Sequence, residues 1–399
     1  MSINKKAMVS SICILTVISL LMTSGCGLIP DIPGTDESAD GGCLYLDGKK
    51  TEISAPQRET SAYLSFNELQ KLIYSSAYTA LISGYNTFKL GGVNYNSVFA
   101  EYESVLSRFF NDYPEFFWLN GYVEVNAEYV EGSSLGSVTV TLGIYEHWKN
   151  TDLESARAKF TDELKKLVHE ASVLEDDYAK AKFVHDTLIK NTYYDYDSYN
   201  AGKEIDSESN AVVNSAYGPL VDGRAMCGGY SRAYLLVLSK LGIEADYVTG
   251  DADGGPHAWN SVKLGDSCYF VDLTWDDTDG EPCEIIYYYF CIDREDLEKT
   301  HSVDAEFSNI DADSEEFNYY VREELYLEEY DFDKLDSMWT CEANEGMLTV
   351  RFRTTAEMDK AYEDLIRSSR IYELSAMKDI SSYQYMISNE FNILTVLYE

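Results

Sequence analysis

The pattern that follows Cys227 constrains the fold more than any other feature of the chain. After this cysteine and two glycines, apolar residues recur at helical spacing until Gly242 ends the pattern: Tyr230, Ala233, Tyr234, Val237, Leu238 and Leu241. Cys227 is therefore predicted to lie at the N-terminus of a helix. Unpaired backbone N–H groups and the positive end of the helix dipole favour a thiolate there, and the same N–H groups can bind an oxyanion.

A strand and a short loop are expected next along the chain. Residues 243–249 have the character of a strand, and residues 250–256 are rich in Gly, Asp and Pro, which suits tight turns at the rim of a cleft. Asp251 and Asp253 in this loop can be interpreted as calcium ligands or as turn residues. A turn is the preferred interpretation, because the full ligand series of a calcium loop is absent from the sequence.

A predicted β-hairpin then carries a base and an acid. Residues 257–264 and 268–274 form its two arms, with the turn centred between positions 265 and 266. In that register Asp272 lies opposite Trp259 and diagonal to His257, on one face of the hairpin. A slip of one residue would turn the carboxylate to the other face, so the register decides whether the acid and the base can meet.

These predictions bring three chemically matched groups together. Cys227 is the candidate nucleophile, His257 the candidate base, and Asp272 the carboxylate that fixes the imidazole tautomer and stabilises its protonated form. His185 and His301 carry no partner pattern and are interpreted as core or boundary histidines. The sequence contains no CxxC pair and no Cys/His cluster, so neither a metal nor another cofactor is expected.

The same region resembles the transglutaminase-like superfamily, in its bacterial secreted branch, over residues 193–277. The resemblance is carried by Cys227-Gly228-Gly229-Tyr230, Leu241-Gly242-Ile243, Gly250, His257-Ala258-Trp259-Asn260 and Val271-Asp272-Leu273-Thr274-Trp275-Asp276. It implies that Cys227, His257 and Asp272 match the catalytic triad of the family. Gly228 departs from the family pattern, in which Glu or Gln often follows the nucleophile, and this puts one polar contact near the thiol in doubt.

The resemblance also implies a fold class and a reaction. The expected fold is α+β, with a papain-like core in which the nucleophile at a helix N-terminus packs on an antiparallel sheet. The expected reaction is acyl transfer at protein or peptide amide bonds through a thioester, with hydrolysis placed ahead of cross-linking to an amine. Tyr194, Gly228 and Trp259 are expected to line the oxyanion site or the cleft. The alternative from another class is a surface module that binds peptide or cell-wall glycan without turnover.

The first residues of the chain predict export and a lipid anchor. Lys5 and Lys6 precede an apolar run over residues 7–22 that is short for a membrane span, which suits a signal peptide over residues 1–25. Small residues then lead to Cys26, which resembles the diacylated cysteine of a bacterial lipoprotein box. Simple cleavage of the signal is the alternative. With lipidation, the chain is expected on the outer face of the bacterial cytoplasmic membrane.

The rest of the chain is expected to form a tether and three folded regions. Residues 26–59 are rich in Gly, Pro, Asp, Ser and Thr and lack periodicity, which is typical of a flexible tether. Residues 60–150 are expected to form an N-terminal α+β region, and residues 151–300 the catalytic domain. Residues 301–399 are expected to form a C-terminal α+β accessory domain without an assigned chemistry.

Local signals in the N-terminal region predict helices followed by a hairpin. Ser65 and Glu68 stand at capping-box spacing before a helix that Gly84 ends. Residues 122–130 and 138–145 alternate with a period of two on either side of a Gly-rich turn, which predicts a β-hairpin.

Charge and cysteine content narrow the partners. The formal net charge is -38 at pH 7 and is spread along the chain, so nucleic acid is excluded as an expected partner. The expected partners are a protein or peptide substrate, the membrane through Cys26, and the cell wall. Outside the cell Cys283 and Cys291 can pair, but the sequence does not decide this.

Overall fold

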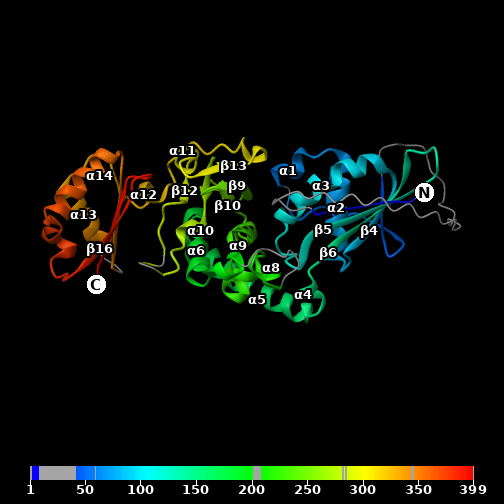
Figure 1. The fold of residues 1–399 in the computed structure, drawn as a ribbon, viewed down its shortest axis with the longest axis horizontal. Helices are drawn as coiled ribbons and strands as arrows, with labels where there is room; N and C mark the ends of the chain where they lie inside the picture. The colour runs from blue at the N-terminus through cyan, green and yellow to red at the C-terminus, as the bar shows by residue number, and fades with distance from the viewer. Residues whose placement is uncertain are drawn as a thin grey trace. The chain divides into compact units, whose positions relative to one another are not determined.

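The structure is a computed structural model that describes residues 2–8, 42–58, 60–200, 208–280, 283, 285–342 and 346–398. The chain divides into two compact units, one formed by Met1–Lys159 with Ser198–Ser215 and the other by Phe160–Asp197 with Ala216–Glu399 (Figure 1). Among the described residues, no helix has the length and apolar character needed to cross a membrane.

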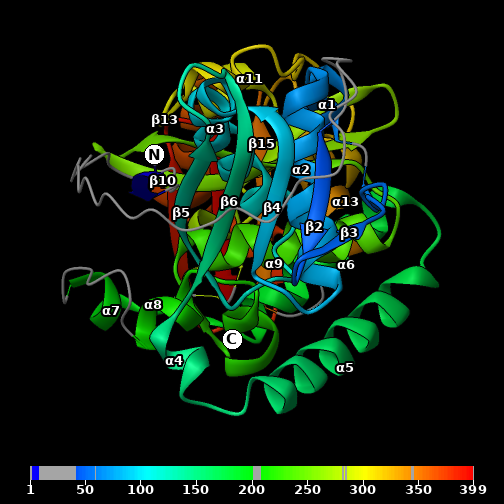
Figure 2. The ribbon, with the colours of Figure 1, turned by 90° about the vertical axis from the view of Figure 1, so that its right-hand side faces the viewer.

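The N-terminal unit contains an antiparallel sheet with strand order β1-β5-β6-β4-β2-β3. Figure 2 shows β5, β6, β4 and β2 side by side. The predicted hairpin is confirmed as β5 and β6, which pair along most of their length. The strands of this sheet are β1 (Ser2–Met8), β2 (Cys43–Leu46), β3 (Lys49–Thr51), β4 (Thr87–Asn94), β5 (Leu119–Tyr129) and β6 (Leu135–Ile144).

Helices α2 (Glu68–Ile82) and α3 (Tyr95–Asp112) contribute to the same core as the sheet. The expected cap at Ser65 is wrong, because Ser65 ends the short helix α1 (Ser61–Ser65) and its hydroxyl donates to the carbonyl oxygen of Ala62. The capping box is instead formed by Asn67 and Gln70, each side chain accepting from the other's backbone N–H at 2.9 Å. The chain also forms short helices at α4 (Glu146–Lys149), α7 (Tyr196–Asn200) and α8 (Glu208–Val213).

The predicted tether is wrong for part of its length. β2 and β3 fall inside residues 26–59, and β2 pairs with β4 through Cys43, Leu44 and Tyr45. Leu44 and Leu46 are buried in the core, so alternation over a very short strand outweighs the polar composition around it. β1, which lies within the predicted signal peptide of residues 1–25, pairs with β5 at the edge of the sheet. Residues 9–41, Cys26 among them, lie outside the described residues.

The second unit contains an antiparallel sheet with strand order β12-β11-β10-β9-β13, and α9 packs on β9 and β10. Figure 1 shows α6 and α9 on one side of this sheet. The predicted α+β class, with a helix N-terminus packed on an antiparallel sheet, is confirmed. Helix α5 (Leu153–Ser172) begins in the N-terminal unit and continues into this one. The elements after it are α6 (Asp177–Lys190), β7 (Tyr193–Tyr194), β8 (Arg224–Ala225), α9 (Cys227–Lys240), β9 (Ala245–Ala252), β10 (Gly255–Leu264), β11 (Ser267–Val271), α10 (Leu273–Asp276), β12 (Phe290–Ile292), α11 (Arg294–Leu297) and β13 (His301–Val303).

The register of the β10–β11 hairpin is the one predicted from the sequence. Asn260 pairs with Val271 and Leu264 pairs with Ser267, which leaves a two-residue turn at positions 265 and 266. The loop expected over residues 250–256 is shorter than predicted, because β9 and β10 are joined by a tight turn at Asp253 and Gly254, both with positive φ. These residues therefore form a hairpin turn.

The C-terminal part of this unit forms a separate sheet with strand order β14-β15-β17-β16. Trp339, Leu348 and Val396 are fully buried in its core, and the indole N–H of Trp339 donates to the carbonyl oxygen of Thr349 at 3.0 Å. At the end of the described chain, β16 and β17 pair as an antiparallel hairpin. The elements are α12 (Tyr319–Arg322), β14 (Tyr326–Leu327), α13 (Phe332–Glu342), β15 (Met347–Phe352), α14 (Thr355–Tyr362), β16 (Tyr383–Ser388) and β17 (Ile393–Tyr398).

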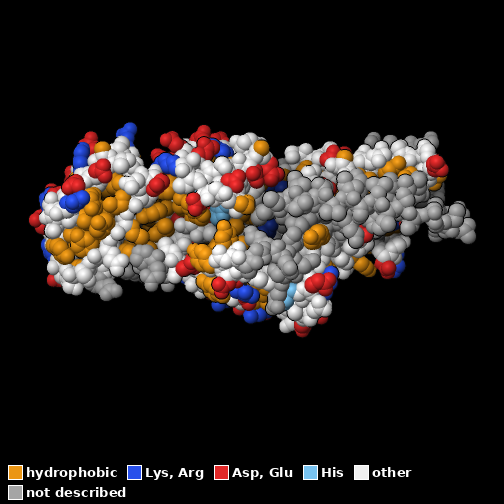
Figure 3. Space-filling model, in the orientation of Figure 1, with side chains coloured by type: hydrophobic (Ala, Val, Ile, Leu, Met, Phe, Trp, Pro, Cys, Tyr) orange, Lys and Arg blue, Asp and Glu red, His pale blue; other side chains and the backbone are white. Residues whose placement is uncertain are grey.

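Acidic side chains are spread over the described surface, and the two cysteines considered for pairing are not bonded to each other. Figure 3 shows Asp and Glu side chains distributed over the described part of the visible face. Cys283 and Cys291 are free thiols in the structure, so the pairing considered for them is not formed there.

A glycine on β9 allows two neighbouring strands to approach closely. A Cβ atom at Gly250 would lie 1.9 Å from the carbonyl oxygen of Ser302 on β13 and 2.8 Å from the Trp259 ring on β10. Because neither the backbone nor the buried ring has room to move, we expect Gly250→Ala to lower the free energy of unfolding by about 1–3 kcal/mol. Urea denaturation measures this change.

The matched control is Gly255→Ala, on the same hairpin, where an added Cβ would meet no atom within 4 Å. Its effect is expected to stay within about 0.5 kcal/mol. Equal stability of the two variants would show that the β9–β13 approach does not require glycine.

Candidate active site

Cys227 is the first residue of α9, as predicted. The preceding residue, Met226, is extended and offers no side-chain cap to the helix. Two hydrogen bonds of 3.0 Å hold this end of the helix against β10: the Ser231 hydroxyl donates to the carbonyl oxygen of Ala258, and the Asn260 amide donates to the carbonyl oxygen of Ser231. The thiol therefore has a fixed place between the helix start and the sheet, where Cys227 is 8% exposed.

His257 on β10 lies beside this thiol. Burial disfavours ionisation of Cys227, but the hydrogen bond and the charge of His257 outweigh it and hold the pKa of the thiol below its ordinary value. The helix N-terminus adds a positive potential at the same place. The pairing of sulfur and imidazole thus favours a thiolate and an imidazolium over a neutral thiol and imidazole.

Asp272 completes the arrangement from the other arm of the hairpin. It follows β11 directly, and His257 Nε2 donates to its Oδ2 at 2.6 Å. Burial lowers the pKa of His257, whereas the charge and hydrogen bond of Asp272 raise it, with a net value of about 10. Because Asp272 occupies Nε2, Nδ1 is the ring nitrogen left to face Cys227.

Asp272 also caps the next helix. Its Oδ1 accepts from the backbone N–H groups of Thr274 at 2.9 Å and Trp275 at 3.3 Å, at the start of α10. Burial favours its neutral form, but the charge and hydrogen bond of His257 and the hydrogen bond of His301 keep the pKa of this carboxyl well below its usual range. The residue is held as a carboxylate in a fixed orientation.

His301 is buried, as its interpretation as a core or boundary histidine implies, but it also has a partner at this site. It lies on β13, and its Nε2 is 3.2 Å from Asp272 Oδ2, the oxygen that also accepts from His257. No local spacing signals this contact, because β13 reaches the site by pairing with β9, which lies about fifty positions earlier in the sequence. The contact could be found only from the tertiary structure.

His257, Asp272 and His301 have side chains of the kinds that bind metal ions. Their ligand atoms lie within 4.8 Å of one another, and all three residues are buried. Both imidazoles, however, meet one carboxylate oxygen at hydrogen-bonding distance. This geometry is that of a hydrogen-bonded network, so we assign the three residues to the network and not to a metal.

His185 is buried, as its interpretation as a core or boundary histidine implies, but it has acidic partners. On α6, its Nδ1 is 2.9 Å from Asp186 Oδ1 and its Nε2 is 3.2 Å from Asp276 Oδ2. Burial raises the pKa of Asp276 to about 7 despite the opposing hydrogen bond from His185. This pair joins α6 to α10, the helix that Asp272 caps.

The three other expected site residues have different surroundings. Gly228 is buried in the first turn of α9, next to the thiol. Tyr194 lies on β7, which runs parallel to β8 with Tyr194 paired to Ala225, two residues before Cys227. Trp259 is fully buried and stacks on His257 at a ring distance of 5.8 Å, so it supports the imidazole from inside and does not line an open cleft.

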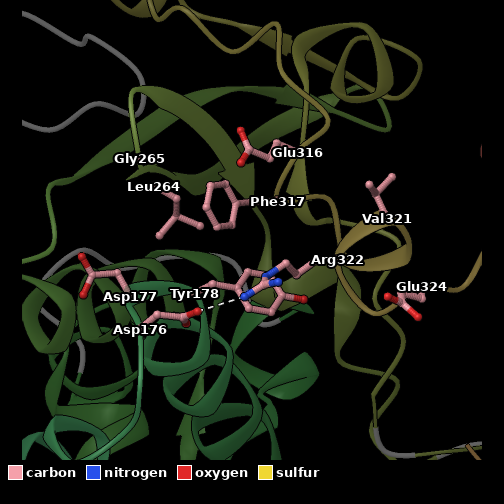
Figure 4. A pocket seen from close by; sticks show the side chains of 10 residues that line it. All are labelled: Asp176, Asp177, Tyr178, Leu264, Gly265, Glu316, Phe317, Val321, Arg322 and Glu324. Atoms are coloured by element: carbon pink, nitrogen blue, oxygen red, sulfur yellow. Dashed lines mark hydrogen bonds and ion pairs between the residues drawn. The ribbon is translucent and has the colours of Figure 1, made fainter. Parts of the chain in front are cut away.

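A groove elsewhere in the second unit does not include the cluster. Its volume is about 540 Å³, and Figure 4 shows Arg322 paired with Asp176 near Tyr178 and Phe317. The full lining is Asp176, Asp177, Tyr178, Leu264, Gly265, Glu316, Phe317, Val321, Arg322 and Glu324.

Residues 165–276 match the family model of the Transglutaminase-like superfamily. Among solved structures, the chain is similar to one described as a TGase, with 22% identity and a TM-score of 0.28, covering 37% of this chain and 43% of that one. It is also similar to a candidate cysteine protease from Cytophaga hutchinsonii, with 16% identity and a TM-score of 0.24, covering 38% and 62%. The chain thus spans less than two thirds of either structure. No curated protein matches it.

The charge of Asp272 is expected to control the reactivity of Cys227. Asp272→Asn removes the charge that stabilises the imidazolium, so the pKa of His257 falls and the thiolate–imidazolium pair is lost as pH rises through a lower value than in the wild type. We expect alkylation of Cys227 at neutral pH to slow about tenfold to a hundredfold. The rate of reaction with iodoacetamide measures it.

Asp251→Asn is the matched control, because Asp251 is an exposed residue on β9 in the same sheet. It should alkylate at the wild-type rate. An unchanged rate in Asp272→Asn would mean that the carboxylate does not activate the site.

Proposed function

We propose that the protein catalyses acyl transfer at protein or peptide amide bonds through a Cys227–His257–Asp272 triad, with hydrolysis as the main outcome. The observation that carries this proposal is the 2.6 Å hydrogen bond between His257 and Asp272, with the imidazole held against a thiol at a helix N-terminus. Nucleophile, base and orienting carboxylate then stand in the order that cysteine-dependent acyl transfer requires. The match of residues 165–276 to the Transglutaminase-like superfamily supports it.

Acylation uses the thiolate and the imidazolium together. The Cys227 sulfur attacks the amide carbonyl carbon, and the negative charge that develops on the carbonyl oxygen is stabilised by backbone N–H groups at the start of α9. His257 then gives its proton to the amide nitrogen, the C–N bond breaks, and an amine leaves. The product is a thioester between Cys227 and the acyl group.

Deacylation reverses these roles. Neutral His257 takes a proton from water as the water oxygen attacks the thioester carbonyl. The C–S bond breaks, and a carboxylic acid leaves while the thiolate and the imidazolium are restored. Asp272 stays ionised throughout, because its low pKa keeps it from accepting the proton.

An amine can replace water in the second half of the reaction. That outcome joins the acyl group to the amine and corresponds to cross-linking by a transglutaminase. The residues of the triad act identically in both cases, so the acceptor must be determined by experiment. A module that binds peptide or cell-wall glycan without turnover would require no reactive thiol at all.

The first functional test measures both acceptors on one substrate. Purified protein is incubated with casein, with and without a labelled primary amine, and released peptides and attached label are quantified. We expect peptide release by the wild type and a loss of at least about a thousandfold in Cys227→Ala.

Cys268→Ala provides the matched control, because Cys268 is a partly buried thiol on β11 of the same sheet and should retain full activity. Attachment of label without peptide release would replace hydrolysis by cross-linking. Absence of both products, with a Cys227 no more reactive than an ordinary thiol, would support the binding module.

We also propose that Cys26 anchors the protein to the outer face of the bacterial cytoplasmic membrane. The support is the charged, apolar and small-residue order of the first 26 residues. In bacteria fed labelled palmitate, the wild type should take up label and partition with membranes. Cys26→Ala should do neither, and Cys43→Ala should behave as the wild type. Label in Cys26→Ala would place the anchor elsewhere.

A further inference from the structure

His301 is held firmly beside the proposed triad. Its side chain is fully buried, and its ring lies 4.6 Å from the Trp275 ring, 5.0 Å from the Trp259 ring and 5.3 Å from the Tyr289 ring, centre to centre. Its Nδ1 is 2.8 Å from Thr300 Oγ1, and Thr300 Oγ1 accepts from the hydroxyl of Tyr289 at 3.3 Å. Both ring nitrogens therefore have partners, which fixes the plane of the imidazole.

The direction of the hydrogen bond to Asp272 follows from its chemistry. A carboxylate only accepts, so His301 Nε2 carries the proton and donates to Asp272 Oδ2 at 3.2 Å. His257 Nε2 donates to the same oxygen at 2.6 Å. One carboxylate oxygen thus accepts hydrogen bonds from two imidazole N–H groups.

This second hydrogen bond affects the thiolate. The positive charge of the His257 imidazolium is attracted both to Asp272 and to the Cys227 thiolate. The negative charge of Asp272 also acts on the thiol directly and raises the pKa of Cys227. An N–H group of His301 that donates to Asp272 Oδ2 offsets part of this negative charge. A second donor on the orienting carboxylate therefore weakens the repulsion between Asp272 and the Cys227 thiolate.

We propose that His301 is a positioning residue of the triad: it holds Asp272 in place and offsets part of its negative charge, which favours the Cys227 thiolate. This inference rests on the proposed function, since it assigns a role within the same site. Thr300 keeps the His301 ring in the donating orientation.

Titratable groups on several neighbouring elements of the described chain face Asp272 and His301. Cys227 faces them from α9, His257 from β10 and Asp276 from α10. Tyr289, just before β12, faces them as well and is itself influenced by Glu390. A pH profile of the site therefore has to be compared between variants that leave all of these groups in place.

The experiment is the pH dependence of alkylation of Cys227 by iodoacetamide in the full chain, which needs no substrate. The acid limb reports formation of the thiolate, and the alkaline limb reports loss of the imidazolium. His301→Leu removes the second donor, so the full negative charge of Asp272 acts on His257 and Cys227. The imidazolium becomes more stable and the thiolate less so, and both limbs should move to higher pH by about half a unit.

His301→Gln tests whether a donor is sufficient. The amide nitrogen of Gln reaches nearly as far as Nε2 and can donate to Asp272, so the limbs should return close to the wild-type positions. Thr300→Val removes the hydroxyl that orients His301 and should give a smaller shift in the same direction. Ser302→Ala, an exposed neighbour on β13, is the control and should leave the profile unchanged.

Two results would overturn the proposal. Limbs of His301→Leu that coincide with the wild type would show that the donor does not affect the ion pair. A shift in His301→Gln as large as in His301→Leu would show that only the shape of the ring matters. If His301→Leu does not fold, Thr300→Val decides, and an unshifted profile contradicts the proposal. An intact profile without turnover on casein would instead count against the proposed function alone.

Discussion

The hydrogen bond between His257 Nε2 and Asp272 Oδ2 is the interaction on which the site depends. Asp272 is 1% exposed, and a carboxylate buried to that degree is stable only when its oxygens are satisfied. Its donors come from several elements: the helix that it caps, the neighbouring strand and β13. The same contacts that make the carboxylate tolerable in the interior also fix the imidazole beside Cys227.

The elements around this hydrogen bond hold α9, the β10–β11 hairpin and β13 close together. The register of β10 and β11 puts Asp272 next to His257, and the bond from Ser231 to Ala258 holds the start of α9 on the same strand. Gly250 lets β13 approach closely enough for His301 to reach the carboxylate. The proposed chemistry therefore depends on the sheet β12-β11-β10-β9-β13 and on α9, which packs against it.

Much of this site follows from local sequence, since both the start of α9 and the register of the hairpin depend on spacing within short segments. His301 could not be foreseen, because its contact arises when β13 pairs with a distant strand. The strand at Cys43–Leu46 was missed for a similar reason: only its place in the sheet reveals that Leu44 is buried. Asn67, and not Ser65, caps α2, because the chain turns into α1 first.

The state of the Cys227 thiol tests the central claim most directly. The ultraviolet absorbance of the thiolate, taken as the difference between the wild type and Cys227→Ser across pH, gives its ionisation without any substrate. The charge of His257 and the helix N-terminus predict that the pKa of this thiol lies below the ordinary value of about 8.5. Ionisation at or above that value would contradict the thiolate–imidazolium pair and the catalytic role built on it.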